Sequence, residues 1–600
     1  MGEVADRAGD GAFPLLRRTG WRLRTLARHP YWDPPDASWV IRRWPGLTAM
    51  CCATLFFWLS LTPSLVPRPW LLQGVIGGIT AAMGYAIGAL LDWLVRLAHR
   101  RLRRAPRVRR YVRWRPGPRW RPRAWLTYYA LSVLLTIAAL SWSADAQRTL
   151  RALQEMPETL TWHSMMIALM AMGICWLLLA VARAVRLATR KLIRLLARYV
   201  PRPVAIAAGL VISATVVTFG ARDVVFDRGV IDIAARIAES TDKDTKDGIV
   251  QSGSRYVSGS PESLIAWDDL GYEGRNFTGS SLGARQITRV TGKPAVQPIR
   301  VYVGLEAADG FKERAELAVA ELERTGAFER EVLAIAGTTG RGWVNSTDAE
   351  PLEYLHGGDT AIVATQYSYL PSWVSFLVDK EQAGRATRAL VEAVRERWLQ
   401  QPPGDRPQLV VFGESLGAYG IEASFDGPDD MLAKVDGALL AGPPNFSPIR
   451  SELTGERDPD SPVWRPEYKE GRNFRFAQWP EKDFRRPGPY AEWKRPRVAY
   501  LQNASDAIVW WSPDLAFTRP EWLRSPVGPD VTNSVRWFPL VTFWQTSVDM
   551  AVSYGVDAPH GHRYGNGSVA GWAAVAPAEG WTRADTERLQ RFMDAREAPY

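Results

Sequence analysis

The sequence is poor in cysteine, and the few cysteines it has form no recognisable framework. Cys51, Cys52 and Cys175 are the only three in 600 residues, and all lie inside apolar runs. They have neither zinc-ligand spacing nor the pattern of a disulfide scaffold. The sequence also lacks a P-loop, a dinucleotide fingerprint and a metal-binding cluster. We therefore expect no cofactor and no metal.

Acidic residues are scarce in the N-terminal third. Residues 1–223 contain 32 Lys and Arg against 10 Asp and Glu, whereas residues 224–600 contain 42 against 53. A basic region can indicate nucleic-acid binding, but here the arginines lie in short loops between apolar runs. This arrangement is typical of membrane proteins, in which basic loops set the orientation and contact anionic headgroups. We therefore expect a bilayer as partner and no nucleic acid.

Long apolar runs account for most of the N-terminal third. A helix needs about 20 apolar residues to cross a bilayer, and core helices of soluble proteins rarely reach this length without a charge. Three prolines, Pro63, Pro67 and Pro69, predict a tight hairpin between the first two runs. Glycines in the second run permit close helix packing. We expect a bundle of about five spans: Leu47–Val66, Leu71–Val95, Ala124–Trp142, Ser164–Arg183 and Pro203–Gly220.

Loop charges predict the orientation of these spans. The leading tail, residues 1–45, has eight arginines and no convincing cleavage signal, so the first run is expected to be retained. The loop 96–123 has 13 arginines and no acidic residue, and the loop 183–202 is again basic. The two intervening loops are nearly neutral. Because basic loops stay inside, we expect a cytoplasmic N-terminus and an extracytoplasmic C-terminal domain in the cell membrane.

The pattern changes after the last apolar run. We expect domains at 1–45 (Arg-rich tail), 46–222 (transmembrane bundle), 223–297 (an extension with one short helix near 230–240) and 298–600. In the last domain, strand-like runs alternate with helical ones, which predicts a mostly parallel sheet with helices on both faces. The expected strands are 299–304, 331–336, 360–365, 408–412, 435–440 and 498–502.

One motif in this α/β domain indicates chemistry. Gly413-Glu414-Ser415-Leu416-Gly417 reads G-x-S-x-G between a β-rich run and a helical one. This is the context of a nucleophile elbow, which holds a serine in a strained turn above the sheet. The fold class is therefore an α/β-hydrolase domain, and Ser415 is the candidate nucleophile. The alternative is a tight turn whose serine only caps a helix.

A nucleophilic serine needs a histidine base that follows it in the chain of this fold. Three of the six histidines lie in or beside the membrane segment, and His356 precedes the serine. The remaining two, His560 and His562, lie in a loop after an apolar helix. We favour His562 as the base because Gly561 permits a sharp loop. His560 is expected to orient it or to bind substrate.

The third member of the triad should follow a strand between the serine and the histidine. Asp506 lies in a polar turn after the strand 498–502. Asp436 precedes its strand, and Asp514 lies further along the chain. Asp506 is therefore the expected acid, although an aspartate in such a turn can also serve only as an Asx-turn residue.

An oxyanion hole requires two backbone N–H groups. One should belong to Leu416, the residue after the nucleophile. The other should come from the Gly-rich loop 337–343, where Thr339 and Gly340 are the candidates. A plain turn explains this loop almost as well.

Several segments together resemble a known family. They are SLTPSLVPRPWLLQG, RTGAFER, TTGRGW, QYSYLPSW, FGESLGAYG, QNASDAIVWW and HGHRYG, within about residues 40 to 570. The chain resembles bacterial membrane proteins of the "alpha/beta-hydrolase family", which join a multi-span N-terminal domain to an α/β-hydrolase domain. The resemblance implies a serine hydrolase fold and leaves the substrate open.

These features predict a membrane-anchored serine hydrolase, esterase- or lipase-like, that forms an acyl-enzyme on Ser415. Tryptophans and tyrosines near the motifs suit an apolar acyl group or the bilayer surface, which favours a lipid or cell-envelope ester. Two alternatives stay open. In the first, the protein is an acyltransferase that uses the same triad to move an acyl group to a lipid or sugar hydroxyl. In the second, the protein is a membrane transporter or scaffold whose hydrolase domain is vestigial. Oligomeric state is not predicted.

Overall fold

The computed structural model describes residues 46–104, 120–160, 162–485 and 491–598. The predicted Arg-rich tail and most of the predicted loop 96–123 lie outside these residues. Chain contacts separate two compact units. We call them the helical unit (residues up to 152, 157–218 and 534–548) and the α/β unit (153–156, 219–533 and 549–600). A short segment from the C-terminal half, 534–548, thus belongs to the helical unit.

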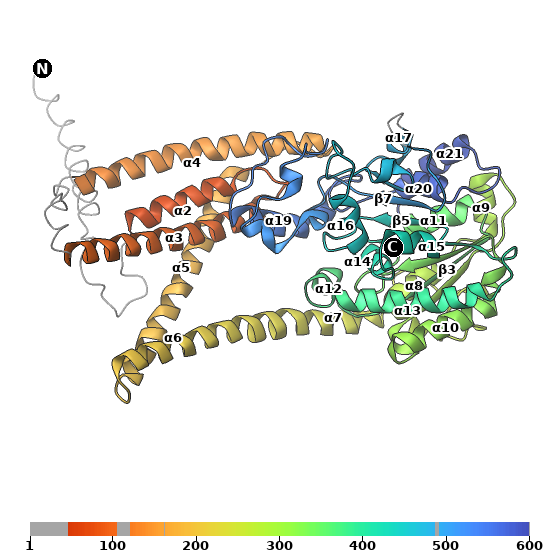
Figure 1. Cartoon of the computed structure of the whole chain (residues 1–600), viewed down its shortest axis with the longest axis horizontal. Helices are drawn as coiled ribbons and strands as arrows, with labels where there is room; N and C mark the ends of the chain where they lie inside the picture. The colour runs from red at the N-terminus through yellow and green to blue at the C-terminus, as the bar shows by residue number, and fades with distance from the viewer. Residues whose placement is uncertain (1–45, 105–119, 161, 486–490, 599–600) are drawn as a thin grey trace, which may run out of the picture. The chain divides into compact units, whose positions relative to one another are not determined.

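The helical unit consists mainly of long apolar helices. Four of them are long and apolar enough to cross a membrane, over Trp70–Ala98, Arg123–Leu153, His163–Leu196 and Arg202–Asp223. The first predicted span is wrong in length, because that helix has only 14 residues and ends before the proline hairpin. The helices are α2 (Leu47–Ser60), α3 (Trp70–Arg104), α4 (Trp120–Leu153), α5 (His163–Leu196) and α6 (Arg202–Phe219) (Figure 1).

Helix α3 packs closely against α2 on one side and α5 on another, as its glycines predict. A Cβ at Gly84 would lie 2.8 Å from Cβ of Phe56 on α2, and one at Gly78 would lie 2.5 Å from Cβ of Ile174 on α5. Such distances leave no room for a side chain. The missing side chains therefore let the helix backbones approach each other.

The hairpin between α2 and α3 is buried and polar. Arg68 is fully buried and donates to Gln73 Oε1 at 2.5 Å and to Ser64 Oγ. Gln545, on α19 (Val541–Val552), donates its Nε2 to the carbonyl oxygens of Ser60 (3.1 Å) and Thr62 (2.9 Å). These bonds hold the segment 534–548 to the end of α2 and satisfy carbonyl groups that the helix end leaves free.

The α/β unit contains a seven-stranded sheet in the order β1-β3-β2-β4-β5-β7-β6, and every strand pair is parallel. Six strands match the predicted ones to within two residues at either end. β6 is not predicted, because four residues carry too little pattern. The strands are β1 (Ile299–Val303), β2 (Val332–Gly337), β3 (Thr360–Thr365), β4 (Gln408–Glu414), β5 (Gly437–Ala441), β6 (Phe474–Ala477) and β7 (Arg497–Leu501).

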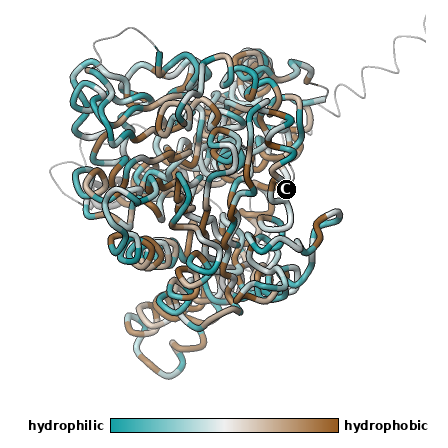
Figure 2. The backbone as a smooth tube through the Cα atoms, turned by 90° about the vertical axis from the view of Figure 1, so that its right-hand side faces the viewer, coloured by the Kyte–Doolittle hydropathy of each residue, from teal (hydrophilic) through white to brown (hydrophobic). Residues whose placement is uncertain are grey.

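The strands form the core of this unit because helices cover both faces of the sheet. All residues of β1, β2, β3 and β5 are buried. Figure 2 shows hydrophobic segments in the middle of the view and both hydrophilic and hydrophobic ones along its edges. The main covering helices are α10 (Gly310–Thr325), α11 (Ser346–Leu355), α13 (Lys380–Leu399), α14 (Leu416–Glu422), α20 (Gly567–Val575) and α21 (Arg583–Asp594).

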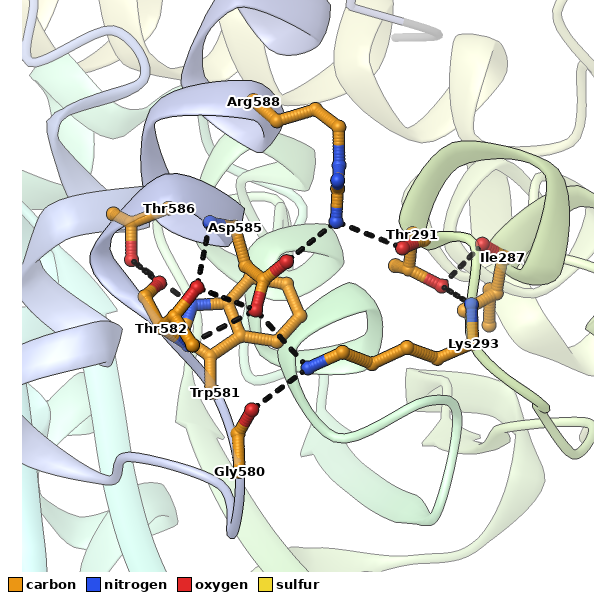
Figure 3. Close-up of polar contacts among 9 residues, drawn as sticks. All are labelled: Ile287, Thr291, Lys293, Gly580, Trp581, Thr582, Asp585, Thr586 and Arg588. Carbon is orange, nitrogen blue, oxygen red and sulfur yellow. Dashed lines mark hydrogen bonds and ion pairs between the residues drawn. The ribbon is translucent and has the colours of Figure 1, made fainter.

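Among the described residues, the segment before the sheet contains three α-helices, of which only the first is predicted: α7 (Asp232–Asp242), α8 (Gly271–Gly279) and α9 (Ala284–Thr291). The C-terminal helix α21 packs near α9 through a polar cluster (Figure 3). Asp585 completes a capping box with Thr582 and also binds Lys293 Nζ at 3.1 Å. Arg588 bridges Asp585 and the carbonyl of Thr291. The cluster therefore joins the beginning and the end of the α/β unit.

Candidate active site

Ser415 lies between β4 and α14 in a strained backbone conformation. Its φ is 56° and its ψ is −122°, a region that non-glycine residues rarely adopt. The Ser415 N–H donates to the carbonyl of Ala441 at the end of β5 (2.8 Å). A Cβ at Gly413 would lie 2.6 Å from the carbonyl carbon of Gly417. A Cβ at Gly417 would lie 2.2 Å from the carbonyl oxygen of Gly337. The elbow therefore needs both glycines of the motif, as its sequence predicts.

Asp506 and His562 are hydrogen-bonded to each other in the interior. Asp506 Oδ2 lies 2.6 Å from His562 Nδ1, and both side chains are fully buried. Beside an ionised carboxylate, Nδ1 carries the proton and donates it. His562 Nε2 is also buried and has no hydrogen-bond partner among the described residues. That nitrogen is the one a catalytic base must turn toward the serine.

The local structure fixes both residues. Asp506 caps the short helix α18 (Ala507–Trp510), because its Oδ1 accepts a hydrogen bond from the Ile508 N–H at 2.8 Å. The residue therefore stabilises its own turn and contacts the histidine at the same time. Tyr564 donates its hydroxyl to Asp506 Oδ2 at 2.5 Å. The backbone N–H of His562 donates to the carbonyl of Ser553, and Gly561 has a φ of 54°. Gly561 therefore supplies the sharp turn that the sequence indicates.

Opposing effects determine the pKa of His562. Burial lowers it, because a charged ring is poorly solvated in the interior. The carboxylate of Asp506 and that of Glu414 outweigh burial, so the pKa is raised above its ordinary value. A raised pKa makes the ring a stronger proton acceptor.

His560 does not contact Asp506 in this arrangement and has its own acid. His560 Nδ1 lies 3.1 Å from Asp530 Oδ2, which also accepts from Ser505 Oγ (2.5 Å) and from Gln478 Nε2 (2.8 Å). Ser505 Oγ in turn accepts from the Gly561 N–H at 2.8 Å. Asp530 therefore connects the histidine loop to the turn that carries Asp506. Sequence reasoning missed Asp530, since no motif surrounds it.

Glu414, the variable residue of the G-x-S-x-G motif, lies in a buried polar cluster. Its Oε2 accepts from Asn345 Nδ2 at 2.6 Å, and its Oε1 accepts from the Tyr554 hydroxyl at 3.2 Å. The ring of Tyr554 meets that of His562 edge-on, with centroids 5.0 Å apart. Burial raises the pKa of Glu414, and burial together with the Glu414 charge raises that of Asp348 more strongly.

The predicted oxyanion donors differ in availability. Leu416 is the first residue of α14, so its N–H has no partner within that helix. The Thr339 N–H donates to the carbonyl of Trp343 at 3.1 Å, so in this structure it is not free to bind an oxyanion. A Cβ at Gly340 would lie 2.9 Å from the backbone of Ser372, which shows that this loop packs tightly. Gly340 stays the candidate for the second donor.

A row of aromatic ring contacts begins at Tyr419, one helical turn after the nucleophile. Tyr419, whose N–H donates to the Ser415 carbonyl, has its ring 5.1 Å from that of Phe446. Phe446 is 5.1 Å from Phe376, which is 5.7 Å from Trp511. Two further tryptophans, Trp537 and Trp544, belong to the helical unit instead. Among the described residues, no group of three or more His, Cys, Asp or Glu is arranged to hold a metal ion.

A parallel sheet with a G-x-S-x-G elbow after a central strand defines the α/β-hydrolase class. Comparison with family models gives the same class: residues 299–589 match the alpha/beta-hydrolase family, and residues 61–281 match the N-terminal region of that family. The chain belongs to this alpha/beta-hydrolase family. Comparisons with curated proteins and with solved structures found no match.

Proposed function

We propose that the chain is a membrane-anchored serine hydrolase that acts through Ser415, His562 and Asp506. The observation that carries this proposal is the buried Asp506–His562 hydrogen bond in a protein whose elbow serine has a φ of 56°. The acid and base follow the serine in the chain order that this fold uses. Four helices long and apolar enough to cross a membrane support the anchoring.

The reaction uses each residue in turn. His562 Nε2 accepts the Ser415 hydroxyl proton while Oγ attacks the ester carbonyl, and the Leu416 N–H stabilises the oxyanion. The imidazolium then gives its proton to the departing alcohol, which leaves an acyl-enzyme. Water attacks the acyl-enzyme carbonyl and loses a proton to His562. The imidazolium returns that proton to Ser415 Oγ as its bond to the acyl carbon breaks and the acid product is released. Asp506 stabilises the imidazolium in both steps.

A row of aromatic side chains that begins at Tyr419, four residues after the nucleophile, supports an apolar acyl group. Tyr419, Phe446, Phe376 and Trp511 form consecutive ring contacts. Such a wall favours hydrocarbon chains through burial of apolar surface. Together with the apolar helices, this supports a lipid or cell-envelope ester as substrate.

A chain-length series of nitrophenyl esters tests the proposal with the full-length protein in detergent. We expect a burst of nitrophenol, followed by slower steady-state turnover. The value of kcat/KM should rise from acetyl to longer acyl chains. The Ser415→Ala variant should show neither phase. A separate reaction with added glycerol shows, from the glycerol ester formed, whether a hydroxyl competes with water for the acyl group. Equal turnover by the wild type and by Ser415→Ala would contradict a serine mechanism.

A further inference from the structure

One buried arginine contacts both ends of the turn that carries Asp506. Arg450 lies in α16 (Pro448–Gly455), and its side chain is buried. Its Nε donates to Gln502 Oε1 at 2.9 Å, and its guanidinium carbon lies 4.8 Å from the centre of the Trp510 ring, within the range of a cation–π contact. Gln502 directly follows β7, and Trp510 is the last residue of α18. The steps of the proposed reaction give this arginine no role.

The two contacts reach the backbone on either side of Asp506. Gln502 donates its Nε2 to the carbonyl of Trp464 at 2.6 Å, so its amide is held with Oε1 toward Arg450. Trp510 donates its Nε1 to the carbonyl of Ala504 at 2.8 Å, two residues before the acid. A displacement of the Trp510 ring therefore moves the backbone of the turn. Because Asp506 also caps α18, the orientation of its carboxylate depends on this backbone.

A purely structural ion pair with Glu422 is the alternative role for Arg450. Glu422 is fully buried, but its Oε2 accepts from the backbone N–H of Arg450, at 2.9 Å. Glu422 Oε1 and Arg450 Nη2 have no hydrogen-bond partner among the described residues. No hydrogen bond therefore joins these two side chains in the described part of the chain. The side-chain hydrogen bond of Arg450 instead goes to the turn that carries the acid.

Arg450 keeps its charge at neutral pH in spite of burial. Burial lowers its pKa to about 10, and the Glu422 charge opposes this effect, followed by Tyr564 and Asp506. The Arg450 and Asp506 charges thus attract each other, which adds to the two contacts with the turn. We propose that Arg450 is a positioning residue, which holds the turn 502–510 so that Asp506 stays hydrogen-bonded to His562. This role rests on the proposed function.

Arg450→Met tests the proposal, because methionine removes the charge and the hydrogen bond while it still fills space in the interior. The full-length proteins in detergent hydrolyse one nitrophenyl ester over a range of pH. We expect kcat to fall about 10- to 100-fold with little change in KM. The acid limb of kcat/KM should move to lower pH, because Asp506 raises the pKa of His562 and a displaced Asp506 does so less. A variant that is only less stable would lose active enzyme without moving this limb.

Arg497→Met is the matched control, because Arg497 makes similar contacts at the opposite end of β7. It donates to the carbonyls of Trp493 (3.0 Å) and Ala574 (2.8 Å), and its guanidinium carbon lies 5.6 Å from the centre of the Trp493 ring. We expect this variant to keep the kcat and the acid limb of the wild type. A shift of the same size in Arg497→Met would show a general loosening of the sheet and would overturn the proposal.

A second variant keeps the test decisive if Arg450→Met does not fold. Burial raises the pKa of Glu422 to about 7, and Arg450→Met leaves that carboxyl without its neighbouring cation. The double variant Arg450→Met, Glu422→Gln removes both charges, and Glu422→Gln alone is its reference. The acid limb of the double variant should again lie at lower pH than that of its reference.

Failure of this role and failure of the proposed function give different results. Equal turnover by the wild type and by Ser415→Ala would contradict the proposed function. If Ser415→Ala is inactive and the wild type is active, the serine mechanism holds. An acid limb that then stays in place, or moves to higher pH, in the folded Arg450 variant would overturn the positioning role alone.

Discussion

Asp506 holds His562 with one carboxylate oxygen and the helix α18 with the other. Oδ2 lies 2.6 Å from His562 Nδ1, and Oδ1 lies 2.8 Å from the Ile508 nitrogen. The capping bond prevents the carboxylate from rotating away from the histidine. The orientation of the ring is thus set by the same turn that ends β7.

The first prediction separates the two histidines. His562→Ala removes the proposed base and should lower kcat/KM by about 10³-fold or more. His560→Ala leaves the base in place but removes the hydrogen bond between His560 and Asp530. The loss of kcat/KM should therefore be about 10- to 100-fold, as for other supporting residues. Steady-state kinetics of both purified variants with one ester substrate measures the difference.

Asp530→Asn provides a control for this comparison, because it weakens the same supporting network without touching Asp506 or His562. Its loss should resemble that of His560→Ala. If His560→Ala were as inactive as Ser415→Ala while His562→Ala stayed active, the two histidines would have to exchange roles.

The second prediction concerns pH. The base acts in its neutral form, so kcat/KM should rise with pH through the pKa of His562, which is raised above its ordinary value of about 6.5. Burial lowers the pKa of His562, and the Asp506 carboxylate raises it. The Glu414 charge raises it further, with a smaller effect than that of Asp506. Glu414→Gln should therefore move the acid limb of the profile to lower pH.

Asp348→Asn is the matched control, because the charges that raise the pKa of His562 are those of Asp506 and Glu414. Its acid limb should coincide with that of the wild type. An acid limb that stays in place in Glu414→Gln, or moves to higher pH, would show that Glu414 does not tune the histidine.

Most of the sheet could be predicted because buried parallel strands give continuous apolar runs. Six of the seven strands are visible in the sequence for this reason, and Phe474–Ala477 is too short to stand out. The first apolar run is misleading, because hydropathy continues beyond Ser60 into the hairpin although the helix ends there. The role of residues 534–548 in the helical unit depends on distant contacts that no local pattern indicates.

The third prediction concerns topology. The alternation of basic and neutral loops predicts that residues 224–600 lie outside the cytoplasm. Alkaline phosphatase fused after Tyr600 should be active, and green fluorescent protein at the same place should be dark. Because α2 has only 14 residues, a second fusion in the 61–69 hairpin shows whether that helix crosses. The opposite pattern after Tyr600 would reverse the orientation.

The fourth prediction concerns the C-terminal helix. Burial raises the pKa of Asp585, but the Thr582 N–H and the Lys293 ammonium outweigh it and lower the pKa to about 2. A lowered carboxyl pKa contributes stability above the unfolded value of about 3.9 that is lost as pH falls toward 2. Asp585→Asn should cost about 1 kcal/mol at pH 7, as for other helix caps.

Hydrogen exchange of the α21 amides checks this effect locally, with Asp594→Asn at the other end of the helix as control. Protection in Asp585→Asn should be lower than in wild type at pH 7, and the difference should shrink in acid. Equal protection in both proteins at pH 7 would show that Asp585 does not stabilise the first turn of α21.

The candidate triad could be found from sequence because each member lies beside a local signal: the elbow motif, a strand end and a Gly-containing loop. Supporting residues have weaker signals. Tyr564 lies two residues after His562, but Tyr554 and Asp530 reach the site only through folding. The Thr339 N–H looked available in a Gly-rich loop, yet the turn uses it internally. Backbone donors of this kind are decided by loop geometry, which residue types alone do not determine.

The central claim is that Ser415 is a nucleophile activated by His562. Its most direct test is labelling of the full-length protein with a fluorophosphonate, followed by peptide mass spectrometry. We expect a single adduct on Ser415 in the wild type, none in Ser415→Ala, and labelling slowed by several orders of magnitude in His562→Ala. An adduct on another residue, or a Ser415→Ala protein labelled as fast as the wild type, would contradict the account.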